Sequence, residues 1–154
     1  MDTRLGRLSS TPASSGLPAG LRNPIKPEQF AGKHEAQLGK RVGVTQFGVN
    51  HLVLEPGSVS ALRHWHEFED EFVYVLSGEL VLIDENGEHG LSAGDFAGFP
   101  AGAANAHHLV NKSASPATYL VIGTRKRGRE VIHYPDDNLG PITVLRDASG
   151  DRVT

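Results

Sequence analysis

Two histidines and a glutamate in the middle of the chain have a spacing that suits a metal site. His64 and His66 are separated by one residue, so on a β-strand both side chains point to the same face. Imidazole rings placed together on one face can chelate a single metal ion. Glu71 follows five residues after His66, an odd offset that would face away on an unbroken strand. It joins the histidines only if the chain bends within the polar segment 67–70.

The composition restricts the chemistry that such a site can use. The 154 residues include no cysteine, which excludes disulfides and thiolates and leaves imidazole and carboxylate as transition-metal ligands. The 15 Lys and Arg residues nearly balance 18 Asp and Glu, so no strong field favours nucleic acid or an acidic membrane. No apolar run approaches the ~20 residues that span a bilayer, and the N-terminus lacks the apolar region of a signal peptide. We therefore expect a soluble cytoplasmic protein.

The elements that must position these residues are mostly short strands. Residues 1–20 are rich in Ser, Pro, Ala and Gly and predict a flexible tail, and residues 21–154 form one domain. The segment 23–38 predicts a strand or a short turn, with a helical turn near 27–31. Asn86-Gly87 is a strong signal for a two-residue hairpin. Strand signals cover residues 41–57, 60–66, 71–78, 79–87, 95–102, 107–111, 117–124 and one further stretch within 130–147.

Eight or nine short strands with almost no helix indicate an all-β sandwich or barrel. Alternation along 71–76 places Glu71, Val73 and Val75 inside and their neighbours Phe72, Tyr74 and Leu76 outside. Trp65 projects opposite His64 and His66. The outward aromatic residues Trp65, Phe72 and Tyr74 favour a homodimer contact, with packing inside the chain as the alternative.

Two segments resemble the sequence motifs of the cupin superfamily. The segment GSVSALRHWHEFEDEFVYVLSG (57–78) is similar to the first motif, with Gly57 one residue too far upstream. The segment GDFAGFPAGAANAHHLVN (94–111) is similar to the second, although four residues instead of two separate Gly102 from His107. The matching positions are His64, His66, Glu71 and Gly78 in the first motif, and Gly94, Pro100, Gly102, His107 and Asn111 in the second. The resemblance covers about residues 40–125.

This resemblance implies a double-stranded β-helix, or jelly-roll, barrel that holds one divalent metal ion. The implied ligands are His64, His66, Glu71 and His107, a set that suits Mn, Fe, Ni, Co or Zn. Such a set leaves open positions on the ion for a substrate. His108 would face the other way by alternation, and a register slip in the longer loop would exchange it with His107.

Three functions fit this resemblance. The first is a metal-dependent enzyme on a small oxygenated substrate such as a sugar or sugar phosphate, because small single-domain bacterial cupins of this kind are often named sugar-phosphate isomerases. The second is an Fe-dependent dioxygenase, and the third a non-catalytic module that binds a small ligand. An isomerase needs a base beyond the metal ligands; Glu55, Glu79 and His108 are candidates, and none is assigned.

Further charged groups have less specific interpretations. Arg125, Lys126, Arg127 and Arg129 form a basic loop that either stays in water or receives a phosphate, and the solvated loop is favoured. Glu67, Glu69 and Asp70 are expected to form a solvated acidic corner rather than to contact a substrate. The remaining histidines, interpreted as structural or exposed, are His34, His51, His89 and His133.

Overall fold

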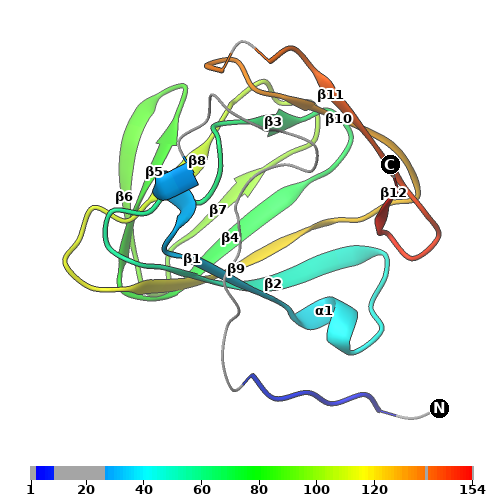
Figure 1. Cartoon of the computed structure of the whole chain (residues 1–154), viewed down its shortest axis with the longest axis horizontal. Coiled ribbons are helices and arrows are strands. Elements are labelled where there is room, and N and C mark those ends of the chain that lie inside the picture. The colour runs from blue at the N-terminus through cyan, green and yellow to red at the C-terminus, as the bar shows by residue number, and fades with distance from the viewer. Residues whose placement is uncertain (1–2, 9–26, 138, 154) are drawn as a thin grey trace.

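The computed structural model describes residues 3–8, 27–137 and 139–153, and the regular secondary structure of these residues is almost entirely β-strand (Figure 1). Most of the predicted tail, residues 1–2 and 9–20, lies outside the described residues. The helical elements are a 3-10 turn η1 (Pro27–Phe30) and one short helix α1 (Leu38–Arg41). Among the described residues no helix has the length and hydropathy to cross a membrane. The cytoplasmic location stays a prediction.

The strands are β1 (Lys33–Gln37), β2 (Phe47–Leu54), β3 (Trp65–His66), β4 (Glu71–Ser77), β5 (Glu79–Asp84), β6 (Gly87–Ser92), β7 (Phe96–Phe99), β8 (His108–Val110), β9 (Ala117–Thr124), β10 (Gly128–His133), β11 (Ile142–Arg146) and β12 (Arg152–Val153). They form a five-stranded sheet in the order β1-β2-β9-β4-β7, a three-stranded sheet β6-β5-β8 and a four-stranded sheet β12-β11-β10-β3. In Figure 1 the five-stranded sheet runs through the middle, β5 and β6 stand at one side, and β10 and β11 arch over the top. This all-β jelly-roll architecture confirms the predicted fold class.

Strand register decides which side chains face the interior. Along β4, Val73 and Val75 are buried while Tyr74 and Leu76 are exposed, so the predicted alternation is confirmed. Glu71 pairs with Gly123 of β9, and Gly123 pairs with Gly48 of β2. The two residues beside Glu71 across the sheet therefore carry no side chain, and the guanidinium of Arg125 lies across Gly48.

Two clusters of apolar side chains hold the sheets together. The larger lies between the five-stranded and three-stranded sheets, and the smaller lies beneath η1 and the four-stranded sheet. The larger contains Leu52, Leu54, Val73, Val75, Leu80, Leu82, Phe99, Leu109, Ala117 and Tyr119, and the smaller contains Phe30, Leu62, Ile132 and Tyr134. On the outer face of the five-stranded sheet, Phe72 stacks on Phe96, which is 66% exposed. The expected homodimer stays a prediction.

The hairpin between β5 and β6 differs from its prediction by one residue. Asp84 pairs with Gly87, so the two-residue loop is Glu85–Asn86, and Gly87 begins β6 with a positive φ of 110°. Strand β6 has no sequence signal of its own, because GEHGLS carries almost no apolar or β-branched residue. Its pairing with β5 organises this edge of the sheet, since β5 buries Leu80 and Leu82 in the core.

Two other predicted strand stretches also differ from the strands in the structure. The stretch 130–147 contains two strands, β10 and β11, where one was expected. The stretch 60–66 was expected as a strand, but only Trp65–His66 pairs as one, with an isolated bridge between His64 and His107. Backbone pairing to a distant segment, rather than local propensity, sets this conformation.

The acidic corner is not a solvated charge run, because Glu69 is buried. Its carboxylate receives two hydrogen bonds from Arg146 of β11, at 2.5 Å from Nε to Oε2 and 3.0 Å from Nη2 to Oε1. Arg146 also donates to the carbonyl of Gly150. Glu69 and Arg146 are only 6% and 8% exposed. This ion pair fastens the bend between β3 and β4 to the C-terminal strands.

We expect Arg146→Met to lower the free energy of unfolding by about 3–5 kcal/mol, because it leaves the buried Glu69 carboxylate without a counter-charge. Urea denaturation followed by circular dichroism measures this change. The matched control is Lys112→Met, which removes a cation from an ion pair with Glu88 in which both side chains are about half exposed. That change should lower the free energy of unfolding by less than about 1 kcal/mol. Equal losses in the two variants would contradict the structural role of the buried pair.

Candidate metal centre

Backbone pairing brings the two motif segments together. The amide of His107 donates to the carbonyl of His64 at 2.9 Å, and the amide of His64 donates to that of His107 at 3.2 Å. His66, in β3, pairs with Ile132 of β10. The bend at 67–70 then returns the chain into β4, so that Glu71 faces the histidines despite its odd offset along the sequence. The structure therefore contains the bend that the sequence spacing of His66 and Glu71 required.

The rings of His64, His66 and His107 surround the carboxylate of Glu71. Glu71 Oε1 lies 2.9 Å from His107 Nε2, and Glu71 Oε2 lies 3.5 Å from His66 Nε2. The ring of His64 is centred 5.0 Å from that of His66 and 5.1 Å from that of His107. One ligand atom each from His64, His66 and Glu71 lies within 4.8 Å of the others, a spacing that one metal ion could bridge.

Hydrogen bonds on the far side of two rings fix which nitrogen faces the centre. His64 Nδ1 lies 2.6 Å from the carbonyl oxygen of Leu62, and His107 Nδ1 lies 2.9 Å from that of Asn105. A carbonyl oxygen only accepts, so each Nδ1 carries a proton and donates it. In the neutral ring Nε2 then presents a lone pair to the centre, opposite a carboxylate oxygen that also has only lone pairs. A cation between them satisfies both groups, and the donor set therefore fits a divalent metal ion.

The ionisation of these groups suits the same role. Burial lowers the pKa of His64 to about 4, so this ring is neutral at pH 7. Burial would raise the pKa of Glu71, but the rings of His107 and His66 that face its oxygens outweigh burial and hold that pKa well below its usual range. For His66, burial is outweighed by the hydrogen bond and charge of Glu71, and its pKa is raised. Metal binding requires a neutral imidazole and an ionised carboxylate, and His64 and Glu71 already have these forms.

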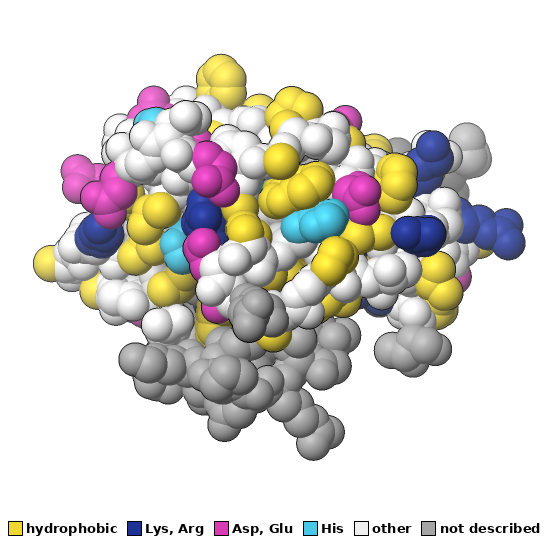
Figure 2. Space-filling view, turned by 90° about the horizontal axis from the view of Figure 1, so that it is seen from above, with side chains coloured by type: hydrophobic (Ala, Val, Ile, Leu, Met, Phe, Trp, Pro, Cys, Tyr) yellow, Lys and Arg dark blue, Asp and Glu magenta, His cyan; other side chains and the backbone are white. Residues whose placement is uncertain are grey.

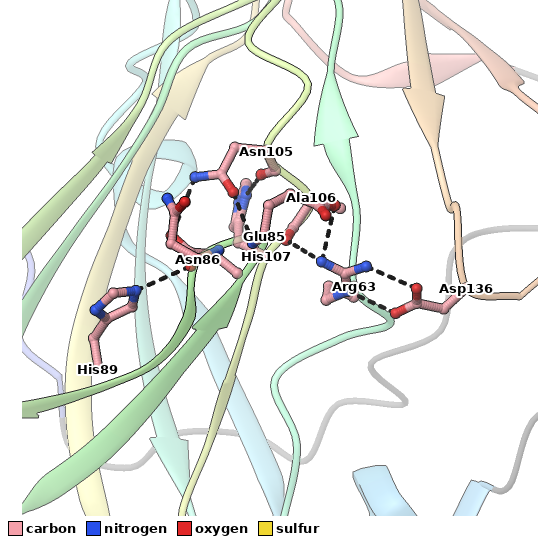
Figure 3. A network of polar contacts seen from close by, with 9 residues as sticks. Arg63, Glu85, Asn86, His89, Asn105, Ala106, His107 and Asp136 are labelled. Atoms are coloured by element: carbon pink, nitrogen blue, oxygen red, sulfur yellow. Dashed lines mark hydrogen bonds and ion pairs between the residues drawn. The ribbon is translucent and has the colours of Figure 1, made fainter.

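The lengthened loop before His107 is anchored by polar contacts (Figure 3). The side chain of Asn105 donates to Asp84 and accepts from the amide of Glu85, which ties the loop to the β5–β6 hairpin. Arg63 donates to the carbonyl of Ala106 at 3.0 Å. The two extra residues thus form a braced turn.

Arg63 also links this loop to the turn after β10 and to the β5–β6 hairpin. Its guanidinium forms two hydrogen bonds with Asp136, in the turn after β10, and one with Glu85. The structure places His107, not His108, beside Glu71, because the ring of His108 is turned toward the carbonyl of Ala61, 2.9 Å from its Nδ1. Phe99 stacks on the ring of His107 with centroids 3.5 Å apart, which restricts its rotation.

The centre opens into a cavity of about 840 Å³ inside the barrel. Its wall also includes Lys33 and Glu35 of β1, which no sequence pattern singled out. Lys33 Nζ lies 3.8 Å from Glu35 Oε2, and the two side chains are 12% and 23% exposed. Burial lowers the pKa of Lys33, against the opposing charges of Glu35 and Glu71. The alternation in KHEAQ was visible, but only pairing with β2 shows that Lys33 and Glu35 face inward.

The candidate bases from the sequence have different positions. Glu55 lies 3.7 Å from His34 and Glu79 is exposed, and neither lines the cavity. His108 does line it. In the basic loop, Arg125 lines the cavity, whereas Lys126, Arg127 and Arg129 are exposed. The loop is therefore solvated for the most part, as expected, with one cation turned inward.

The other histidines and Trp65 have structural contacts. His89 pairs with Asp84 at 3.0 Å. The ring of His133 stacks on Trp65 with centroids 4.0 Å apart, and its Nε2 lies 3.3 Å from Glu67. Packing within the chain therefore accounts for Trp65. Figure 2 shows histidine, acidic, basic and hydrophobic side chains interspersed on one face of the molecule.

Comparison with known proteins agrees with this fold and site. The sequence matches the Cupin domain family over residues 50–123. A cupin-superfamily sugar phosphate isomerase of Silicibacter pomeroyi is 43% identical, with 80% of this chain and 82% of that chain covered and a TM-score of 0.69. A protein of Acidithiobacillus ferrooxidans, provisionally named a sugar phosphate isomerase, is 34% identical, with 79% and 74% covered and a TM-score of 0.67. The chain belongs to the cupin superfamily.

More distant structures share only the fold. A predicted oxalate decarboxylase of Thermotoga maritima is 24% identical over 60% of this chain and 79% of that chain, with a TM-score of 0.52. Among curated proteins none matches the sequence significantly.

We expect His107→Ala to weaken binding of a divalent metal severely, because it removes an Nε2 that faces Glu71. His108→Ala is the matched control, one residue away, and should leave the affinity unchanged. Elemental analysis of untagged protein and titration with Zn²⁺ measure both. The reverse order of effects would show that the longer loop exchanges the two histidines.

Proposed function

We propose that this protein is a metal-dependent isomerase of a small sugar phosphate. The observation that carries the proposal is the convergence of His64, His66, Glu71 and His107 on a cavity that also contains a charged Lys33–Glu35 pair. The names of the two most similar proteins reported above support this substrate class. The volume of about 840 Å³ lies in the range of small-molecule sites.

His64, His66, Glu71 and His107 would hold one divalent ion. The nitrogen and oxygen donor set suits Mn, Fe, Ni, Co or Zn. When bound, such an ion supplies a Lewis acid that polarises a substrate carbonyl. The protein contributes a fixed set of ligands, because backbone carbonyls hold the rings of His64 and His107 and Phe99 packs on His107.

Isomerisation of an aldose to a ketose moves a proton between two adjacent carbons, and Lys33 is placed to carry it. Burial lowers the pKa of Lys33, which increases the fraction of neutral amine that can accept a proton from carbon. Glu35, 3.8 Å away, stabilises the ammonium that results. The same ammonium then returns the proton to the neighbouring carbon, so the step consumes neither an oxidant nor a reductant.

Metal-loaded protein should interconvert aldose and ketose phosphates without consuming oxygen, with the substrate C–H exchanging in D2O. Nuclear magnetic resonance with a panel of sugar phosphates measures both. Lys33→Met should lower kcat by about 100-fold or more with metal content unchanged. Lys112→Met, on the surface, is the control. An unchanged kcat in Lys33→Met would remove the base assignment, whereas oxygen uptake with Fe(II) or no turnover by the wild type would contradict the isomerase.

Arg125 is the group that we assign to the substrate phosphate. Its guanidinium lies across Gly48, where any Cβ would collide with it, and it lines the cavity. The neighbouring cation Arg146 is already neutralised by Glu69. Charge-assisted hydrogen bonds from a guanidinium suit phosphate oxygens.

Arg125→Met should raise KM for a phosphorylated sugar by about 10- to 100-fold, the effect of losing one charge-assisted contact. Arg127→Met removes an equal charge from an exposed position of the same loop and should have little effect. Steady-state kinetics of the two variants provides the comparison. Similar KM values for both variants would mean that the loop acts only through its overall charge or not at all.

A further inference from the structure

His66 differs from the other two histidines of the centre in the surroundings of its Nδ1 atom. In His64 and His107 this atom donates to a backbone carbonyl. In His66 it is buried and has no hydrogen-bond partner in the described structure. Buried polar atoms of folded proteins are nearly always hydrogen-bonded. We therefore expect an acceptor for Nδ1 of His66 close to the ring.

A second unpaired atom lies beside it. Glu130 of β10 is 1% exposed, and its Oε1 accepts from the amides of Phe68 at 3.2 Å and Val131 at 2.9 Å. Its Oε2 is buried and, among the described residues, also has no hydrogen-bond partner. Since β10 pairs with β3 through Ile132 and His66, Glu130 lies on the strand next to the histidine.

Glu69 is the other carboxylate near this ring. One ligand atom each of His66, Glu69 and Glu130 lies within 4.8 Å of the other two. Both oxygens of Glu69 already accept from Arg146. Glu130 therefore provides the one carboxylate oxygen of this cluster that is still available, and His66 provides the one donor that still needs an acceptor.

We propose that Glu130 is a positioning residue of the metal centre, whose Oε2 accepts a hydrogen bond from His66 Nδ1 while Nε2 binds the metal. A ligand atom of Glu130 lies within 4.8 Å of a ring nitrogen of His66, and the two unpaired atoms are both buried. It would hold the ring and its tautomer as the carbonyls hold the other two histidines, and the carboxylate charge would make Nε2 a stronger ligand. The inference rests on the metal site of the proposed function and not on its reaction.

The first test is zinc affinity of the full-length protein, measured by competition with a chelator. Glu130→Gln keeps an oxygen for the amides of Phe68 and Val131, and it should weaken Zn²⁺ binding by about 10- to 100-fold. The matched control is Glu67→Gln, which removes the same charge from a carboxylate paired with His133 and should bind as the wild type does. Equal affinities of Glu130→Gln and the wild type would overturn the proposal.

A second test uses only the wild-type protein, so it does not depend on the folding of a variant. Nitrogen-15 spectra of the metal-free wild type at alkaline pH, where the ring is neutral, should show His66 with its proton on Nδ1. A proton on Nε2 would overturn the proposal, and so would two zinc ions per chain, which would make the cluster of His66, Glu69 and Glu130 a second cation site. Zinc binding with the expected tautomer but without sugar phosphate turnover would support Glu130 and count against the isomerase.

Discussion

The carboxylate of Glu71 is the group on which the arrangement of this barrel depends. A buried charge is unfavourable unless hydrogen bonds and an opposite charge surround it. Glu71 meets this requirement through His107, which follows the lengthened loop, and His66, which precedes the bend. Segments about forty residues apart in sequence must therefore approach the same point.

Flanking contacts keep those segments in place. Arg63, directly before His64, binds the loop that carries His107 as well as the turn after β10. Glu69, within the bend, is held by Arg146 of the C-terminal strands. Residues on both sides along the chain thus hold the polar centre in place, and these residues are not themselves candidate metal ligands.

Local sequence was sufficient for the features that depend on alternation. The strands rich in β-branched and aromatic residues, such as β4 and β9, were predicted almost to their ends. The spacing of His64, His66 and Glu71 required a bend if they were to share one site, and the resemblance to the cupin motifs implied that they do. The polar strand β6 was missed, because it is ordered by its partner β5 rather than by its own composition. Lys33 and Glu130 could not be recognised from the sequence, since their inward orientation depends on pairing with strands distant in the chain. Arg125 was noted within the basic loop, but the sequence could not separate it from the exposed cations of that loop.

The position of β1 at the edge of the five-stranded sheet separates two parts of the chemistry. Lys33 and Glu35 belong to a strand that pairs on one side only, with β2, whereas Glu71 belongs to a strand enclosed by β9 and β7. Under the proposed function, substitutions in β1 would alter proton transfer while His64, His66, Glu71 and His107 stay in place. The edge strand would then be a replaceable unit, which could change the reaction carried out in the barrel without changing the four candidate metal ligands.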